Sequence, residues 1–471
     1  MQKQRKSVRD ASSAVVALLA GTLLGSVHAQ QTEPAPVPVP VAAEGAAPAN
    51  GTAGLQALRR ARDAQIAGRE FQTALKPAQD LIAAQQQSPH DVTYANDLAA
   101  LGRIYAELRD VDAAESRYLE AIALITKAEG EFTPTLIDVY RGLGRSYIRG
   151  ARYPEAITTL ETAQNVSQRN LGLFNVEQSP LLDDLTTAYL GLGDTTEAQK
   201  RQLDRLANAV RRFGADDARV IPFRYVLANY YERSRLPESA SKQYEEVLKS
   251  QATTHGDTDA TLLSPLRQIV KIDLLITQAS KPEHRDRLAM LLEHLPDDAD
   301  AVDRGLSLAV LGDWATVAND SVGARSYYNQ AWAALTQNPQ FDVASYFSAP
   351  SMIDFIAPLN PVDRNARSRL YAWNQIQFNF NVSPDGLPSN VTIVGLGEDQ
   401  EPTPIQSQFS RRLRETHFRP RLLAGNPVLT VNVKSTHYYR YYLDKEKKTR
   451  GKNKGKAGDA DGDAGADDKK G

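Results

Sequence analysis

Side chains suited to acid–base or metal chemistry are few and scattered along this sequence. The chain has no cysteine, which excludes disulfides, thiol nucleophiles and cysteine-based metal sites. Its seven histidines show no His-Glu-x-x-His pattern and no other spacing typical of metal ligands. They are His28, His90, His255, His284, His294, His417 and His437. We expect His284 and His294 to be ordinary surface residues, and the sequence predicts no metal site.

Motifs for phosphate, nucleotide or calcium binding are missing or misplaced. No Gly-x-Ser-x-Gly nucleophile turn and no Gly-x-x-x-x-Gly-Lys phosphate loop occurs in the chain. Gly142-x-Gly144 lies in a helical repeat rather than after a strand, which argues against a dinucleotide site. The run from Asp459 spaces three aspartates as a calcium loop does, but Ala464 and Lys470 occupy its sixth and twelfth positions. The sequence therefore predicts that the protein is not an enzyme and uses no cofactor.

The overall charge argues against a nucleic-acid partner. Of the 471 residues, 42% are hydrophobic and 24% are charged, which is ordinary for globular domains. The formal net charge is −2, so the chain has no broad basic field to attract a polyanion. We expect neither nucleic acid nor a small-molecule substrate as a ligand.

A 42-residue repeat organises residues 54–345, the part that reads as helical almost throughout. Successive units begin at Leu101, Leu143, Leu185, Leu227 and Leu311. The first three steps are 42 residues each (143−101, 185−143 and 227−185), and the last is 84 (311−227). We expect a degenerate unit near Ile269 to fill the double step. Self-similarity at such a fixed period is typical of stacked helix pairs.

Each unit carries small and aromatic residues at set places. The first reads Leu101-Gly102-x-x-Tyr105, followed by Ala114 and Ala121. A small residue after the leucine lets the first helix lie close to the second, and the later alanines suit the helix crossing. The pattern Leu-Gly-x-x-Tyr…Ala…Tyr/Phe…Ala resembles the tetratricopeptide repeat, in a variety with longer helices than the standard 34-residue unit.

The resemblance implies a protein-binding groove along the inner faces of the first helices. The family's groove positions fall here on Asn96, Arg103, Arg141, Arg145, Arg149, Tyr225, Asn229 and Arg233. Arginine offers forked donors and stacks on aromatic rings, which suits acidic peptide side chains or a free carboxylate. A solvated helix surface is the alternative interpretation of these residues. Reversing the charge of Arg141 and Arg145 is expected to weaken partner capture without lowering the melting temperature.

In residues 371–443 the hydrophobic residues recur every second position, instead of with the helical period of the preceding part. Ile376, Phe378, Phe380 and Val382 alternate with polar residues, which predicts a half-buried strand. A turn at 383–386 and a second strand near 391–395 complete a hairpin. Pro404 suits the first turn of a helix. Residues 427–442 predict a third strand, in which Leu429, Val431 and Val433 alternate with polar residues.

Short motifs in this region add to the β-β-α-β order. They are Asp385-Gly386, Phe418-x-Pro420 and Gly425-x-Pro427-Val428. Together with the strand pattern they resemble the TonB C-terminal domain, although that family's common Tyr-Pro start is missing. The resemblance implies that a sheet edge, here within Val428–Tyr442, engages outer-membrane transport proteins. Tyr438, Tyr439, Tyr441 and Tyr442 lie there, and they suit a partner surface or packing within the domain equally well.

The N-terminus predicts export. Four basic residues, Lys3, Arg5, Lys6 and Arg9, precede an apolar run at 14–25 and the small-x-small pattern Val27-His28-Ala29. We expect a signal peptide that is cut after Ala29, leaving 51 basic and 56 acidic residues and a net charge of 51−56 = −5. An uncleaved anchor is the alternative, but the run is shorter than the roughly 20 residues of a spanning helix.

Composition divides the rest of the chain into folded parts and connecting segments. Residues 30–53 are rich in Pro and Ala, and residues 444–471 are charged and of low complexity, so neither is expected to fold. Residues 54–88 are expected to form a divergent capping pair. The predicted organisation is a signal peptide (1–29), a linker (30–53), a TPR-like solenoid (54–345), a linker (346–370), a TonB-C-terminal-like domain (371–443) and a tail (444–471). The predicted fold class is mostly α, a TPR-type solenoid followed by a small α+β domain.

These features predict an exported, non-catalytic scaffold or adaptor of the cell envelope, located in the periplasm. It is expected to bind protein or peptide partners, acidic ones included, through the groove and by strand addition at the C-terminal sheet edge. Outer-membrane transport proteins are candidate partners. The alternative is a TonB-like energy-transducing component, anchored in the inner membrane by an uncleaved N-terminal segment and facing the periplasm.

Overall fold

The computed structural model describes residues 51–86, 91–277, 279–296, 299–356, 371–397 and 400–442. The predicted signal peptide, nearly all of the first linker, much of the second linker and the charged tail lie outside these residues. The chain divides into a large unit, residues 1–358 and 376–437, and a small unit, residues 359–375 and 438–471. In the small unit the structure describes the start of β2 (Tyr371–Val382) and the end of β7 (Thr430–Tyr442).

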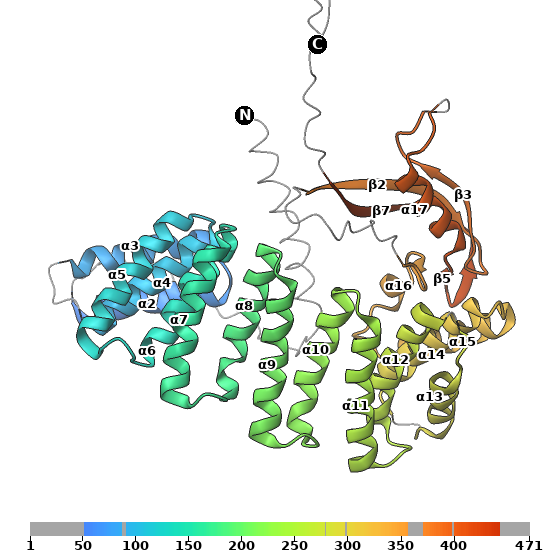
Figure 1. Cartoon of the computed structure of the whole chain (residues 1–471), viewed down its shortest axis with the longest axis horizontal. Helices are drawn as coiled ribbons and strands as arrows, with labels where there is room; N and C mark the ends of the chain where they lie inside the picture. The colour runs from blue at the N-terminus through green and yellow to red at the C-terminus, as the bar shows by residue number, and fades with distance from the viewer. Residues whose placement is uncertain are drawn as a thin grey trace, which may run out of the picture. The chain divides into compact units, whose positions relative to one another are not determined.

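The helical part of the large unit is a series of helix pairs, each in contact with the next (Figure 1). The pairs are α2 (Thr52–Ala67) with α3 (Phe71–Gln85), α4 (Val92–Glu107) with α5 (Val111–Glu129), α6 (Thr135–Arg149) with α7 (Tyr153–Leu171), α8 (Ser179–Leu192) with α9 (Thr195–Phe213), α10 (Ile221–Arg233) with α11 (Pro237–His255), α12 (Leu263–Thr277) with α13 (Glu283–His294), and α14 (Ala301–Val317) with α15 (Ser321–Thr336). Short 3-10 turns precede α8, α10 and α12 at Val176–Gln178, Ala218–Val220 and Ala260–Leu262. The predicted solenoid is confirmed, and α12 with α13 fills the double step. None of the described helices is both long and apolar enough to cross a membrane.

Small residues at the helix crossings hold the two helices of a pair close together. A Cβ added to Gly144 of α6 would lie 2.6 Å from Cγ of Leu160 in α7, and one added to Gly102 would lie 3.1 Å from the ring of Tyr118. Ala114 is fully buried. Larger side chains at these crossings would force the helices apart, so the structure confirms the packing role predicted for the small residues.

The turns repeat with the same 42-residue period. One residue between the paired helices takes a left-handed φ of 55° to 88°: Arg109, Ala151, Gly193, Arg235 and Asn319. An aspartate follows this residue in three of the turns and caps the second helix by accepting a backbone N–H: Asp110, Asp194 and Asp320. The 19-residue second helices α5, α7, α9 and α11 each end at a glycine with φ between 90° and 97°. Side chains with a Cβ rarely adopt that backbone conformation, so glycine at these positions allows the helix to end there.

The C-terminal region contains a three-stranded sheet in the order β3-β2-β7 and one long helix, α17 (Pro404–Glu415). Strand β3 (Pro388–Ile393) pairs antiparallel with β2, and β5 (Arg421–Leu423) with β6 (Asn426–Val428). The inward side chains of β2 are buried with two residues of α17. They are Ile376, Phe378, Phe380, Val382, Phe409 and Leu413. The predicted half-buried strand is therefore confirmed.

Strand β7 departs from the predicted alternation. The expected single strand at 427–442 is divided into β6 and β7, and Asn432 of β7 takes a φ of 55°. Leu429 and Val431 before this point are 58% and 56% exposed, whereas Val433 after it is half-buried. A residue with positive φ interrupts the regular pleat, so alternation in the sequence does not predict which face of β7 is buried.

The first part of the predicted second linker belongs to the fold. The short helix α16 (Val343–Tyr346) leads to β1 (Ser351–Met352), which pairs with β4 (Phe418–Arg419). Phe347 between them is fully buried, and its carbonyl accepts the N–H of Leu422 at 3.2 Å. The sequence analysis assigned residues 346–370 to a linker, but Phe347 and the β1–β4 pairing make the start of this segment part of the fold.

Candidate functional site

The predicted groove residues lie on the first helices of successive pairs. Helices α4, α6 and α8 are neighbours, because α4 contacts α6 and α6 contacts α8. Residues seven or eight positions apart share one face of an α-helix. Arg141 and Arg149 therefore share a face of α6 with Arg145 between them, and Asn96 shares a face of α4 with Arg103. Asn96, Arg103 and Arg145 are exposed, as a binding face requires.

Two of the predicted arginines bridge neighbouring first helices. The Arg141 guanidinium donates from Nε to Oδ2 of Asp184 in α8 at 2.7 Å, and the two side chains are 29% and 17% exposed. Arg149 forms an ion pair with Glu107 of α4, and both side chains are 24% exposed. Burial lowers the pKa of Arg149, and the Glu107 charge opposes that shift. Arg141 and Arg149 therefore stabilise the stacking of α4, α6 and α8.

The other two arginines of this group, Arg103 and Arg145, are more accessible to a ligand. Arg145 is 47% exposed, and its Nε lies 3.9 Å from Oδ1 of Asp184, the outer limit of an ion pair. Arg103 is exposed, and no ion pair joins it to another residue in the described part of the chain. Three of the four guanidinium groups thus pair with Asp184 or Glu107, and Arg103 does not. The exposed Asp138, three residues before Arg141 on the same face of α6, is a third carboxylate, so the face carries four positive and three negative charges. The excess positive charge makes this face suitable for an anionic ligand.

The remaining predicted residues form a separate group on α10. Tyr225 is half-buried and donates its hydroxyl to Oγ of Ser264 at 3.3 Å. Its ring lies 5.5 Å from the ring of Tyr244. Asn229 and Arg233 are exposed on the same helix. Because α8 follows α6 and precedes α10 in the series of first helices, the predicted set comprises two groups with α8 between them.

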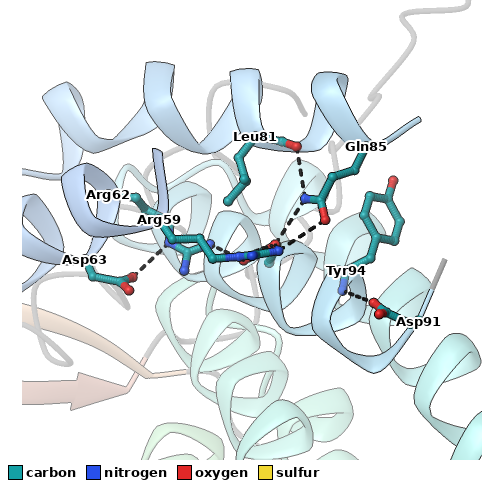
Figure 2. A network of polar contacts seen from close by, with 8 residues as sticks. Arg59, Arg62, Asp63, Leu81, Gln85, Asp91 and Tyr94 are labelled. Atoms are coloured by element: carbon teal, nitrogen blue, oxygen red, sulfur yellow. Dashed lines mark hydrogen bonds and ion pairs between the residues drawn. The ribbon is translucent and has the colours of Figure 1, made fainter. Parts of the chain in front are cut away.

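Buried ion pairs between first helices recur, and the sequence analysis did not anticipate them. Asp97 of α4 is 3% exposed, and it accepts hydrogen bonds from Arg59 and Arg62 of α2 and from Gln85 of α3. Figure 2 shows these three donors, with the side chains of Arg59 and Gln85 directed toward each other. The Arg59 and Arg62 contacts are each 2.6 Å. An acidic residue between the buried Ala95 and Leu98 was the available signal, because a buried carboxylate requires cationic partners.

Another ion pair between first helices, in which only the arginine is buried, lies further along the solenoid. Arg267 of α12 donates from Nη1 to Oδ1 of Asp303 in α14 at 3.0 Å. Some arginines of the first helices therefore stabilise the fold through ion pairs, and only the exposed arginines are candidates for partner binding.

The histidines differ from expectation at one position. His284 is half-buried, and its Nδ1 lies 2.8 Å from Oδ2 of Asp273, which links α13 to α12. The hydrogen bond to Asp273 raises the pKa of His284. His294 is exposed, as expected. The described residues contain no group of three or more side chains that could hold a metal ion.

The predicted sheet edge is the end of the β3-β2-β7 order, where β7 has β2 as its neighbour. Tyr438 is 46% exposed, and Tyr439 is half-buried. The side chains of Tyr441 and Tyr442 lie outside the described residues. An unpaired strand edge presents backbone N–H and C=O groups to which a peptide can add.

Comparison with known families identifies the repeats. Residues 94–169, which cover α4 to α7 apart from their ends, match the family model of the tetratricopeptide repeat. The chain carries tetratricopeptide repeats. This match covers the helices that hold Asn96, Arg103, Arg141, Arg145 and Arg149.

Solved structures with similar helix arrays share little sequence with the chain. The C-terminal part of a TPR repeat-containing protein from Cytophaga hutchinsonii is 14% identical and covers 60% of this chain and 97% of its own, with a TM-score of 0.40. PilF of Pseudomonas aeruginosa is 15% identical, covering 62% and 96% with a TM-score of 0.31. A Rap protein complexed with competence and sporulation factor is 13% identical, covering 59% and 73% with a TM-score of 0.33. Comparison with curated protein sequences finds no match.

Proposed function

We propose that this protein is a non-catalytic scaffold that captures protein partners on the face formed by α4, α6 and α8. The observation that carries the proposal is the unbalanced charge of that face, where Arg103 and Arg145 are exposed beside two arginines already paired. The tetratricopeptide-repeat fold supports a protein partner, because stacked helix pairs offer an extended surface rather than an enclosed pocket. The charge favours an acidic peptide segment.

The test compares two double charge reversals in the full-length protein. Arg103→Glu with Arg145→Glu is expected to abolish crosslinking of partners to a photoreactive residue placed at Asn96. The control is Arg212→Glu with Lys242→Glu, which changes the same charge on exposed positions of the second helices α9 and α11. Equal capture by the two variants, at equal melting temperature, would contradict the proposal. Arg141 is left unchanged because reversal there would break the pair with Asp184.

Export to the cell envelope is the second part of the proposal. It is supported by the basic start, the apolar run and the Val27-His28-Ala29 pattern of the N-terminus. N-terminal sequencing of the protein recovered from cells tests it. A first residue of Gln30 supports an exported periplasmic form, whereas an intact Met1 supports the inner-membrane-anchored, TonB-like alternative.

Strand addition at β7 is a second proposed binding mode, and it is the one that would connect the protein to outer-membrane transport. The position of β7 at the end of the sheet order supports it. A photoreactive residue in place of Lys434, which is exposed on β7, is expected to crosslink an envelope transport protein. Crosslinking from Asn96 but never from Lys434 would refute this mode while leaving the helical face in place.

A further inference from the structure

The protein contains an internal example of a carboxylate held by a tyrosine and an arginine. Asp313 of α14 is 5% exposed. It accepts the hydroxyl of Tyr328 at 3.0 Å and the Nε of Arg419 at 2.8 Å. The Arg419 Nη2 donates to its second oxygen at 2.5 Å. A tyrosyl hydroxyl and a guanidinium together thus satisfy one buried carboxylate.

The same tyrosine position recurs in the first repeat without its acid. Tyr118 lies 210 residues before Tyr328, and Arg103 lies 210 residues before Asp313, which is five 42-residue steps in each case. Gly102 and Gly312 are separated by the same interval, and each packs against the tyrosine of its own pair. The first repeat therefore keeps the tyrosine and its glycine but has an arginine where the last repeat has the aspartate.

A third repeat shows how the hydroxyl is satisfied elsewhere. Tyr244, 126 residues after Tyr118, donates its hydroxyl to Oε1 of Glu232 at 2.9 Å. In the first repeat the position of Glu232 is Ala106. The positions equivalent to Asp313 and Glu232 are thus Arg103 and Ala106 in the first repeat, and neither supplies a carboxylate. No hydrogen bond joins the Tyr118 hydroxyl to another residue of the described chain.

Glycine at position 142 lets the Tyr118 hydroxyl reach the face of α6. A Cβ added to Gly142 would lie 2.6 Å from the Tyr118 hydroxyl oxygen, so any other residue would displace the ring. The charges that act on this hydroxyl are those of Arg149, Arg103 and Arg145 and the opposing charge of Glu107, which pairs with Arg149. Burial raises the pKa of Tyr118 to about 12, against the effect of these arginines, so the hydroxyl is a donor at neutral pH.

We propose that the Tyr118 hydroxyl, Arg103 and Arg145 form a seat for one carboxylate of a bound peptide. The ligand carboxylate would accept the Tyr118 hydroxyl as Asp313 accepts that of Tyr328, and Arg103, at the position equivalent to Asp313, would be one of its two cationic partners. The Arg149–Glu107 and Arg141–Asp184 pairs would hold the surrounding helices in position. The inference deepens the proposed function and rests on it, because the seat lies within the face assigned to partner capture. It adds a neutral donor and a defined carboxylate position to what is otherwise a charged surface.

The experiment measures binding of labelled peptides to the full-length protein by fluorescence anisotropy at low salt. The main probe alternates Gly and Asp over seven residues and has an amidated C-terminus. A second probe alternates Gly and Asn and is amidated, and a third alternates Gly and Asn but has a free C-terminal carboxylate. Preference for the first probe assigns the seat to an acidic side chain, and preference for the third assigns it to a chain terminus. Equal binding of all three contradicts a carboxylate seat.

Tyr118→Phe is the decisive variant, because it removes the hydroxyl and keeps the ring. Loss of a hydrogen bond to a charged group predicts roughly a tenfold to hundredfold weaker affinity for the preferred probe. The matched control is Tyr244→Phe, whose hydroxyl is already paired with Glu232; it is expected to leave affinity unchanged. Arg103→Gln, at an exposed position, gives a second reading if the phenylalanine variant folds poorly.

The outcomes separate the seat from the wider proposal. If the Arg103 and Arg145 charge reversal abolishes binding but Tyr118→Phe matches the wild type, the face binds acidic peptides and the seat is refuted. If neither change affects binding, both proposals fail. Weakening by Tyr118→Phe and by Arg103→Gln, with an unchanged Tyr244→Phe control, supports the seat.

Discussion

At the scale of single residues, carboxylates such as Asp97 and Asp184 join the first helices of successive pairs through arginine. Burial of Asp97 would raise its pKa, but hydrogen bonds from Arg59, Arg62 and Gln85 outweigh burial, and the pKa of Asp97 is lowered. A carboxyl group whose folded pKa lies below its unfolded value stabilises the fold above the unfolded pKa. That stability is lost as the pH falls through the folded pKa. The capping pair α2–α3 is therefore expected to loosen first in acid.

Asp97→Asn is predicted to destabilise the α2–α3 cap, because it leaves two arginines beside a neutral amide. Breaking a buried ion pair in this way costs about 3–5 kcal/mol. Amide hydrogen exchange in α2 and α3 at pH 7 measures the effect. The difference from the wild type should shrink below about pH 4, the pKa of an unfolded aspartate.

Asp63→Asn is the matched control for this change. Asp63 also pairs with Arg62, at 2.9 Å, but its side chain is 62% exposed. Exposed pairs contribute little, so exchange in α2 and α3 should stay at the wild-type rate. Equal effects of the two substitutions would show that burial of Asp97 is not what matters.

At the scale of the element, close approach of the two helices in a pair depends on residues with no side chain. Gly144 and Leu160 define the closest such crossing between α6 and α7, and Leu160 is fully buried. The crossing has no room for a methyl group unless Leu160 moves. Packing of this kind is local to one pair, so its loss should affect mainly α6, α7 and their neighbours.

Gly144→Ala is predicted to destabilise the protein by about 1–3 kcal/mol through overpacking. The same substitution made together with Leu160→Ala should cost less than in the wild type, because the shortened side chain makes room for the new Cβ. A double-mutant cycle in chemical denaturation measures this coupling. Additive effects of the two changes would show that the Cβ does not collide with Leu160.

At the scale of the whole molecule, one ion pair ties the C-terminal region to the last helix pair. Arg419 of β4 and Asp313 of α14 are separated by 106 residues, and both are buried. The Arg419 guanidinium also lies 5.1 Å from the ring of Tyr346. A Cβ at Gly386, in the β2–β3 turn, would lie 2.7 Å from Cγ2 of Thr316 in α14. Charge and close packing thus both hold this region of the large unit to α14.

Arg419→Gln is predicted to release the C-terminal region from α14, because Asp313 would lose its charged partner. The expected cost is about 3–5 kcal/mol. Faster proteolysis between α16 and β2 and faster amide exchange in β4 would report the release, with little change in α4 to α7. The control is Arg421→Gln on β5, which is half-buried and has no ion pair with another described residue. Release by both changes would contradict a role specific to the Arg419–Asp313 pair.

Some residues of the predicted binding groove instead form ion pairs within the protein. The tetratricopeptide pattern correctly located the first helices and hence the positions of Arg103 and Arg145. It did not show that Arg141 and Arg149 are bound to Asp184 and Glu107, residues 43 and 42 positions away. Nor did it indicate that the hydroxyl of Tyr118, on a second helix, lies beside those arginines. Repeat periodicity predicts which face a residue occupies, but not its neighbours from the next repeat.

Residue patterns were enough to predict the helix pairs, their 42-residue period, the small residues at the crossings and the buried face of β2. These features depend on hydrophobic periodicity and backbone conformation over a few residues, which are local properties of the chain. Three features follow only from contacts between distant parts of the chain. They are the ion pairs of individual arginines, the carboxylates that accept the hydroxyls of Tyr244 and Tyr328, and the inclusion of residues 343–356 in the fold. These features depend on contacts between side chains of different helices, and a pattern within one segment of sequence does not predict such contacts.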